Sequence, residues 1–241
     1  MTDLTQNSQL QRLQTVLAET IDKVHSDLIE LAENYRGMLT LQQPEGRVEP
    51  FSPEQIADLR TLSEQFLARH PITDGAGFVF NPDRMIASDQ IVQWWVRGSE
   101  GIEPYGFVYD PESPQYYDFT TLPWYSVPAS TGQPKFAGPY IDFLGVDGFI
   151  VTFSQPLIVA DKFIGVATAD IPVARIERLF FEHVSNIPAI MALTSTAGRI
   201  IAVNSSQFLP GDNATLENDD TVVSIPTTVP TMNLVIREIK G

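Results

Sequence analysis

The sequence predicts an α+β protein in which a long N-terminal helix packs along an antiparallel sheet and a smaller β module follows. Three observations support this class. One apolar stripe with helical spacing runs through the first part of the chain, strand-like segments then fill residues 76–170, and a second group of short strands occupies the C-terminal part. We expect the long helix in residues 1–45, the first module in 46–186 and a reduced second module in 187–241.

The first helix is expected over about residues 5–40. Apolar residues recur there at three- and four-residue intervals from Leu10 to Met38, which is the pattern of one buried helical face. This length exceeds that of an average globular helix. The stripe therefore packs against the chain's own sheet or pairs with a second copy as a homodimer, and both remain open.

A second helix is expected to begin at Pro53. Ser52 suits the N-cap, Pro53 suits the first turn, and Gln55 completes the spacing of a capping box. The helix should end before Pro71, because the residue that precedes a proline avoids the helical conformation.

The remaining elements follow from short β-branched and aromatic segments between turn residues. Strands of the first module are expected at 77–80, 91–97, 105–109, 136–141, 149–157 and 163–169, and a helix from Ile171-Pro172 to about Val184. The second module should contain two strand pairs, 189–194 with 200–204 and 221–225 with 233–239. The acidic segment 210–220 between these pairs is expected to be a mobile loop.

Composition excludes several functions. The net charge of −15 disfavours a nucleic-acid partner and a polybasic membrane surface, and the absence of cysteine excludes disulfides and thiolate chemistry. We expect no metal and no cofactor. The N-terminus lacks the features of a signal peptide and no apolar run is long enough to span a bilayer, which favours a soluble cytoplasmic protein over an excised extracytoplasmic fragment.

An enzyme is not expected. The three histidines lie far apart, and no nucleophile elbow, zinc-binding helix motif or phosphate-binding glycine loop accompanies them. A hydrolase or isomerase that uses Asp142 and Asp147 as a carboxylate pair is the remaining catalytic alternative.

The stretch from Tyr105 to Phe153 is dense in aromatic residues and carboxylates, and Lys135 is its only lysine. Rings combined with carboxylates suit a pocket for a cationic organic ligand, although the rings could equally form the core. Asp170, which ends a predicted strand, either binds the ligand's ammonium group or caps the helix that follows. The candidate ligand-binding residues are Tyr117, Trp124, Tyr125, Tyr140, Asp142 and Asp170.

The order and spacing of four segments resemble the double Cache sensor family, whose modules are PAS-like sheets behind a long N-terminal helix. These segments are Trp124-Tyr125, 138–142, 151–156 and 165–171, and the resemblance covers nearly the whole chain. It implies a non-catalytic sensor that binds a small molecule in its first module and signals through a separate partner protein.

Amino-acid-binding members of that family have a Tyr, an Arg five residues later, then Trp-Tyr, and a distant Asp. Tyr117, Trp124, Tyr125 and Asp170 match this motif, but Leu122 occupies the position of the arginine that holds the ligand's carboxylate. The resemblance therefore implies an amine or a quaternary ammonium compound as the ligand.

Two alternatives remain open. Trp95 and Arg97 share one face of a predicted strand, so Arg97, or else Lys135, could replace the missing arginine and bind amino acids or small carboxylates. The other alternative is a dimeric adaptor protein that binds no ligand.

Overall fold

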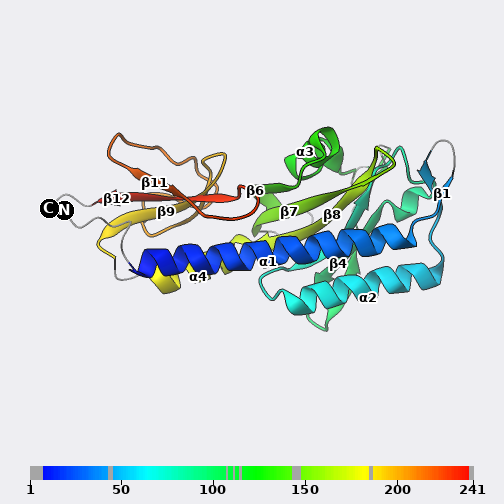
Figure 1. The fold of residues 1–241 in the computed structure, drawn as a ribbon, viewed down its shortest axis with the longest axis horizontal. Coiled ribbons are helices and arrows are strands. Elements are labelled where there is room, and N and C mark those ends of the chain that lie inside the picture. The colour runs from blue at the N-terminus through cyan, green and yellow to red at the C-terminus, as the bar shows by residue number, and fades with distance from the viewer. Residues whose placement is uncertain are drawn as a thin grey trace. The chain divides into compact units, whose positions relative to one another are not determined.

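The computed structural model describes residues 8–42, 46–106, 108–110, 112–113, 116–142, 148–184 and 187–238, without the side chains of Asp142 and Glu238. It confirms the α+β class, with the long N-terminal helix and the antiparallel sheets that the sequence predicts (Figure 1).

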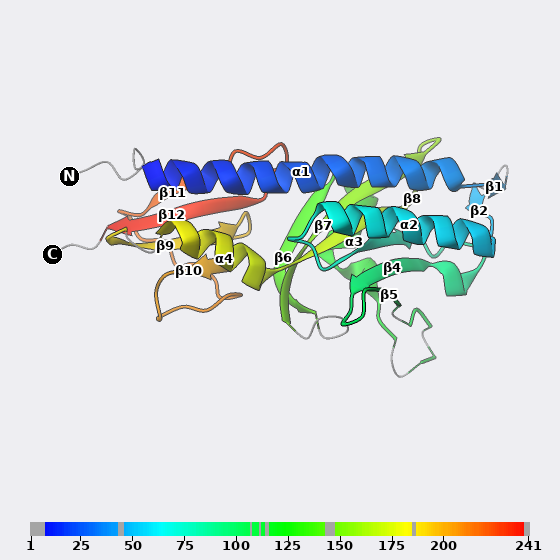
Figure 2. The same ribbon diagram turned by 90° about the horizontal axis from the view of Figure 1, so that it is seen from below.

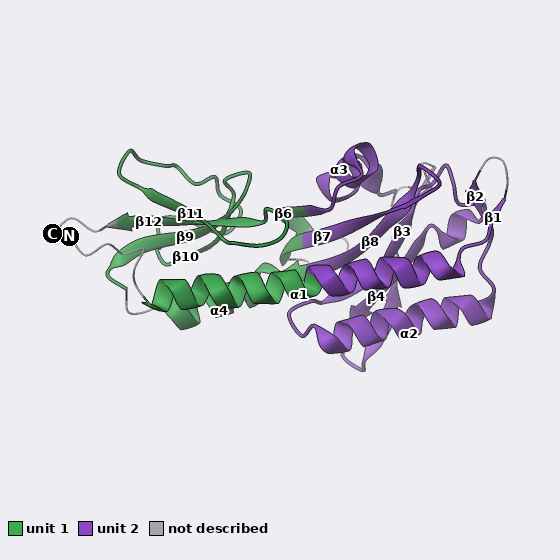
Figure 3. Cartoon of the chain, viewed as in Figure 1, with its two compact units in different colours: residues 1–24, 136–151, 171–241 green, residues 25–135, 152–170 purple. Residues whose placement is uncertain are grey.

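Two compact units make up the chain (Figure 3). Unit 1 combines Met1–Val24, Phe136–Val151 and Ile171–Gly241, whereas unit 2 combines His25–Lys135 and Thr152–Asp170. These limits differ from the consecutive divisions suggested by the sequence. The reason is that the long helix and a central strand each contribute residues to both units.

Helix α1 (Ser8–Met38) buries its apolar stripe within the chain itself. Leu13 and Val24 are fully buried, and Tyr35 packs edge-on against Phe78 at 5.3 Å between ring centroids. The Tyr35 hydroxyl also lies 2.5 Å from Ser63 Oγ on the second helix. The stripe is therefore used inside the chain, while a homodimer stays a prediction.

Helix α2 (Pro53–Arg69) begins as the sequence predicts. The Gln55 N–H donates to Ser52 Oγ at 3.2 Å, and the Ser52 N–H donates to Gln55 Oε1 at 2.9 Å. These two bonds form the expected capping box. At the other end of α2, His70 Nε2 lies 2.9 Å from Asp27 Oδ2 of α1, which ties the two helices together.

The first sheet contains six strands in the order β5-β4-β3-β8-β7-β6. The strands are β3 (Gly75–Phe80), β4 (Val92–Arg97), β5 (Ile102–Tyr105), β6 (Lys135–Asp142), β7 (Gly148–Val159) and β8 (Lys162–Pro172). Strand β5 lies several residues before its predicted position. A short ribbon of β1 (Leu41–Gln42) and β2 (Arg47–Val48) follows α1.

The sequence interpretation missed helix α3 (Pro123–Thr131), which carries Trp124 and Tyr125. Pro123 occupies the first turn, and Gly132 ends the helix with a φ of 67°, a conformation that glycine adopts without strain. The sequence did not predict this helix because Pro128 lies inside it and the residues before it have the composition of a loop.

The second sheet confirms both predicted strand pairs. Its order is β10-β9-β12-β11, and every neighbouring pair is antiparallel. The strands are β9 (Ala189–Ser195), β10 (Ile200–Val203), β11 (Thr221–Ser224) and β12 (Met232–Glu238). Helix α4 (Val173–Val184) packs on β10 within the same unit (Figure 2).

Candidate functional site

The six-stranded sheet has two chemically different faces. Residues directly opposite each other in antiparallel strands project to the same face, and successive residues alternate. Phe78 lies opposite Ala167 and contacts Tyr35 of α1, so this face is the one that the long helix covers. The pairs Gly75 with Asp170 and Gly77 with Thr168 therefore project to the other face, here called the outer face.

Four polar residues of β7 and β8 form a file on the outer face. The Thr152 hydroxyl donates to Asp170 Oδ1 at 2.6 Å, and the hydroxyls of Ser154 and Thr168 lie 3.1 Å apart. The two threonines and the serine are buried, whereas Asp170 is only partly buried. The polar file thus presents a carboxylate in a fixed orientation, held by a buried hydroxyl.

Trp94 lies beside this carboxylate. It sits opposite Gly77 on strand β4, which places it on the outer face. Its indole extends over Gly75, because a Cβ atom at Gly75 would lie only 2.7 Å from Trp94 Cζ2. Gly75 is the residue directly opposite Asp170. The neighbouring Trp95, which the sequence analysis names as a candidate, projects to the opposite face of the sheet.

Trp95 and Arg97 do share a face, but it is the face that carries α2. Trp95 lies opposite Ala76 and is buried. Arg97 Nε donates to the Thr73 carbonyl at 2.9 Å, and its Nη2 donates to the carbonyls of Leu67 and, at 3.3 Å, His70. The guanidinium therefore binds carbonyls at the C-terminal end of α2, where a cation is favourable. This geometry contradicts Arg97 as a replacement for the missing pocket arginine.

Trp124 and Tyr125 form an aromatic cluster with Phe119. The ring of Phe119 is stacked on Trp124 at 5.9 Å and meets Tyr125 edge-on at 5.0 Å. Both motif residues are buried, and neither Trp124 Nε1 nor the Tyr125 hydroxyl has a hydrogen-bond partner among the described residues.

The ring of Tyr125 packs against Phe163 at 5.5 Å, near the start of β8. Asp170 lies seven residues further along that strand. At the rise of an extended strand, this separation corresponds to about 23 Å. The structure therefore does not bring Tyr125 to the carboxylate with which the sequence motif groups it.

The other candidates are placed as follows. Tyr117 is partly buried, and its N–H donates to the Val108 carbonyl at 3.0 Å. Leu122 is partly buried at the N-cap position of α3. Tyr140 is a partly buried residue of β6 in unit 1, so it is described apart from the residues of unit 2. The side chain of Asp142 and all of Asp147 lie outside the described residues.

Asp170 lies in strand β8, which continues to Pro172, and α4 begins at Val173. The Asp170 carboxylate accepts the Thr152 hydroxyl. Capping of α4 by Asp170 stays a prediction.

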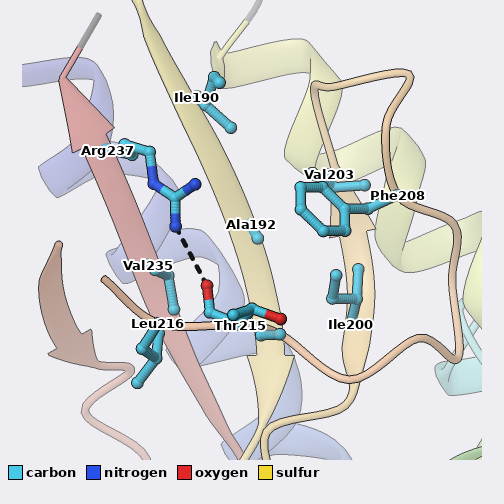
Figure 4. A pocket seen from close by; sticks show the side chains of 10 residues that line it. Ile190, Ala192, Ile200, Val203, Phe208, Thr215, Leu216, Val235 and Arg237 are labelled. Carbon is cyan, nitrogen blue, oxygen red and sulfur yellow. Dashed lines mark hydrogen bonds between the residues drawn. The ribbon is translucent and has the colours of Figure 1, made fainter.

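The second sheet carries a small apolar hollow (Figure 4). Its volume is about 30 Å³. Ala192, Ile200, Val203 and Val235 form its buried floor, and Phe208 packs against them from the loop that follows β10.

The loop between β10 and β11 is attached to the second sheet at several points. Arg237 donates from Nε to Asp220 Oδ1 at 2.8 Å. It also donates from Nη2 to the Thr215 carbonyl at 3.0 Å (Figure 4). Arg199 Nη1 donates to the Gly211 carbonyl at 2.8 Å. These bonds hold the acidic segment that the sequence marked as a loop.

Among the described residues, no group of three or more acidic, histidine or cysteine side chains is arranged to hold a metal ion. The three histidines occupy separate places, where His25 lies near Gln155, His70 near Asp27 and His183 near the Leu179 carbonyl. Within the same part of the chain, no helix has both the length and the apolar character needed to cross a membrane.

Sequence and fold comparisons give one consistent result. Residues 59–178 match the family model described as methyl-accepting chemotaxis protein-like, first PDC sensor domain. None of the curated proteins compared with the sequence matches it significantly.

Three solved structures share the fold. "Methyl-accepting Chemotaxis protein X" has a TM-score of 0.61 and 16% identity, over 94% of this chain and 95% of the other. The extracellular domain of the putative histidine kinase mmHK1S-Z3 has a TM-score of 0.61 and 12% identity, over 93% and 88%. The ligand-binding domain of the Pseudomonas aeruginosa PAO1 chemoreceptor PctB, in complex with L-Arg, has a TM-score of 0.59 and 16% identity, over 96% and 87%.

The expectation of a cytoplasmic protein is wrong. The matched family consists of sensor domains of receptors, and one protein with this fold is described as an extracellular domain. The error arose because the absence of a signal peptide describes only the given N-terminal residues and not the compartment in which the domain acts.

The resemblance to sensor proteins is thus confirmed at the level of the family, while the amine-binding subtype is not tested by these comparisons. Over residues 59–178, the chain is thus similar to the PDC sensor domains of the methyl-accepting chemotaxis protein-like type.

Proposed function

We propose that the chain is a non-catalytic sensor domain that binds a small cationic metabolite, an amine or a quaternary ammonium compound, with Asp170 as the counter-ion. One observation carries this proposal: the Asp170 carboxylate lies on the outer face, turned by the Thr152 hydroxyl at 2.6 Å. Such a carboxylate is oriented before the ligand arrives, so binding loses little conformational freedom there.

The neighbouring groups favour a cation over an anion. The Trp94 indole lies over Gly75, in the row that contains Asp170. An indole face attracts an alkylammonium group by roughly 0.5–2 kcal/mol, depending on how far both are removed from water. Asp170 and Trp94 therefore select the same charge, and an anionic ligand would meet repulsion from the carboxylate.

The absence of the arginine favours an amine over an amino acid as the ligand. Leu122 stands where related amino-acid sensors are expected to have that arginine, and Arg97 is engaged with carbonyls at the end of α2. A ligand carboxylate near Leu122 would lose its hydration without gaining a cationic partner, which is unfavourable. We therefore favour ligands that carry an ammonium group and no carboxylate.

The domain of PctB, which has a similar fold, is described in complex with L-Arg. The domain of mmHK1S-Z3 is described as extracellular, and we propose the same side of the membrane for the ligand site of this chain.

Signalling requires that the ligand bind two arrangements of the domain with different affinity. We propose that ligand binding biases α1, since this helix packs on the face of the sheet opposite the polar file. Output then passes to a separate signalling protein.

The test is isothermal titration calorimetry with choline, ethanolamine, putrescine, glycine and acetate. At least one of the amines should bind, and Asp170→Asn should weaken that binding at least tenfold, which equals about 1.4 kcal/mol. Asparagine retains an oxygen that accepts the Thr152 hydroxyl, so the variant should keep the fold. Asp161→Asn is the matched control, because Asp161 is exposed in the turn before β8 with a φ of 60° that asparagine tolerates.

Two results would reject the proposal. One is amine binding by Asp170→Asn with both affinity and number of sites unchanged. The other is binding of acetate alone, which would favour a carboxylate sensor that uses Lys135. A dimeric adaptor without ligand is the weaker alternative, because the stripe of α1 is already buried by the chain's own residues.

A further inference from the structure

A second hollow lies at the opposite end of β8 from Asp170. It has a volume of about 460 Å³ and lies entirely within unit 2. Its walls come from the turn after β3, from α3 and from the start of β8. The residues that matter for its chemistry are Asn81, Asp83, Tyr109, Tyr125, Ser126 and Phe163.

The hydroxyl of Tyr125 is the most informative group in this hollow. Tyr125 is only 4% exposed, and its hydroxyl has no hydrogen-bond partner among the described residues. Burial, followed by the nearby Tyr109 and Asp83, raises the pKa of Tyr125 above its ordinary value of 10.0. Tyr125 lines the hollow together with Tyr109 and Asp83. A buried donor without a partner is unfavourable, so a ligand oxygen at this point would be stabilising.

The carboxylate of Asp83 supplies a negative charge to the hollow. Its backbone N–H donates to Asn81 Oδ1 at 3.0 Å, which shapes the turn after β3. Its carboxylate has no hydrogen bond or ion pair with the described residues, and the hydroxyl of Ser126 has no such partner either. The rings of Tyr109, Tyr125 and Phe163 complete the wall around these groups.

We propose that this hollow is a second binding site, for a small amino alcohol. The ammonium group of the ligand pairs with Asp83 and lies against the aromatic rings, and its hydroxyl bonds to the Tyr125 and Ser126 hydroxyls. The ammonium group of the ligand therefore pairs with a carboxylate that has no partner, and its hydroxyl pairs with a buried hydroxyl that has no partner. This site is independent of the function proposed for Asp170, because it lies at the other end of the strand.

Calorimetric titration with ethanolamine and propylamine tests the proposal on the whole chain. Both probes carry an ammonium group, but only ethanolamine carries a hydroxyl. In an Asp170→Asn background, ethanolamine should still bind with one site per chain and at least threefold more tightly than propylamine. Tyr125→Phe should abolish this preference while preserving propylamine binding, whereas Asp83→Asn should weaken both at least tenfold. Asp161→Asn should change neither affinity.

The outcomes separate the two sites. If ethanolamine binds the original chain but not the Asp170→Asn variant, the second site is refuted and the proposal for Asp170 stands. If Asp83→Asn and Tyr125→Phe both bind ethanolamine as the original chain does, the second site is also refuted. Thermal unfolding of each variant without ligand verifies the fold, and Tyr125→Phe should be at least as stable as the original, since it removes an unpaired buried hydroxyl.

Discussion

The six-stranded and the four-stranded sheets are both antiparallel, yet the faces described above carry different residues. The outer face of the first sheet presents Thr152, Ser154, Thr168 and Asp170. The second sheet instead presents Ala192, Ile200, Val203 and Val235, which Phe208 covers (Figure 4). The comparison teaches that a few alternating positions decide whether a sheet face carries polar groups or is filled by its own apolar side chains.

The largest expected effect is on the unfolding free energy and concerns the apolar hollow of the second sheet. Ile200→Ala removes a residue that is 2% exposed, and truncation of a buried isoleucine typically costs about 2–5 kcal/mol of unfolding free energy. Chemical denaturation measures this loss. Val222→Ala, on an exposed residue, is the control and should cost less than about 0.5 kcal/mol. Equal effects of both variants would contradict a packed core under the loop.

The second prediction restores the missing arginine of the first module. Leu122→Arg should improve the affinity for glycine relative to methylamine by about tenfold, since a charged hydrogen bond to a carboxylate is worth about 1.5–3 kcal/mol. Calorimetry with the two ligands gives the ratio, and Leu122→Gln controls for polarity without charge. An unchanged ratio would show that Leu122 does not face the ligand.

The third prediction concerns the bonds that hold the loop over the second sheet. Arg237 lowers the pKa of Asp220 through a hydrogen bond, so the pair stabilises the fold while Asp220 is ionised. Asp220→Asn should lower the melting temperature by roughly 2–4 °C at pH 7. A lowered pKa gives stability above the unfolded value of 3.8 that is lost as the pH falls through the folded value. The difference in melting temperature between the original chain and Asp220→Asn should therefore shrink below pH 3.8. A difference that stays constant with pH would contradict stabilisation by the ionised Asp220.

The smallest expected effect tests the position of Trp94 on the outer face. Gly75→Ala places a methyl group 2.7 Å from Trp94 Cζ2, so the indole must move. Binding of the amine should weaken by roughly three- to tenfold, in line with the loss of about one cation–π contact. Gly37→Ala is the matched control, because no atom lies within 4 Å of a Cβ atom there. If both variants bind equally, Trp94 makes no contact with the ligand.

Local patterns predicted much of the fold. The stripe of α1, the capping box at Ser52 and the two strand pairs of the second module all depend on residues close in sequence, and all are present. Helix α3 was missed because Pro128 and the surrounding loop residues concealed its terminal signals. For the candidate site, the strand register shows that Trp94, and not Trp95, shares a face with Asp170, whereas the part of either residue in ligand binding stays a prediction.

The sequence alone determined where most of the helices and strands form, helix α3 excepted, because spacing and capping act within a few residues. Only the tertiary structure decided which face of each strand is covered. Alternation along β4 separates Trp94 from Trp95, but the packing of α2 makes the side of Trp95 and Arg97 the inner one. The pairing of β3 with β8 then brings Gly75 opposite Asp170 from a distant part of the chain, which no local pattern encodes.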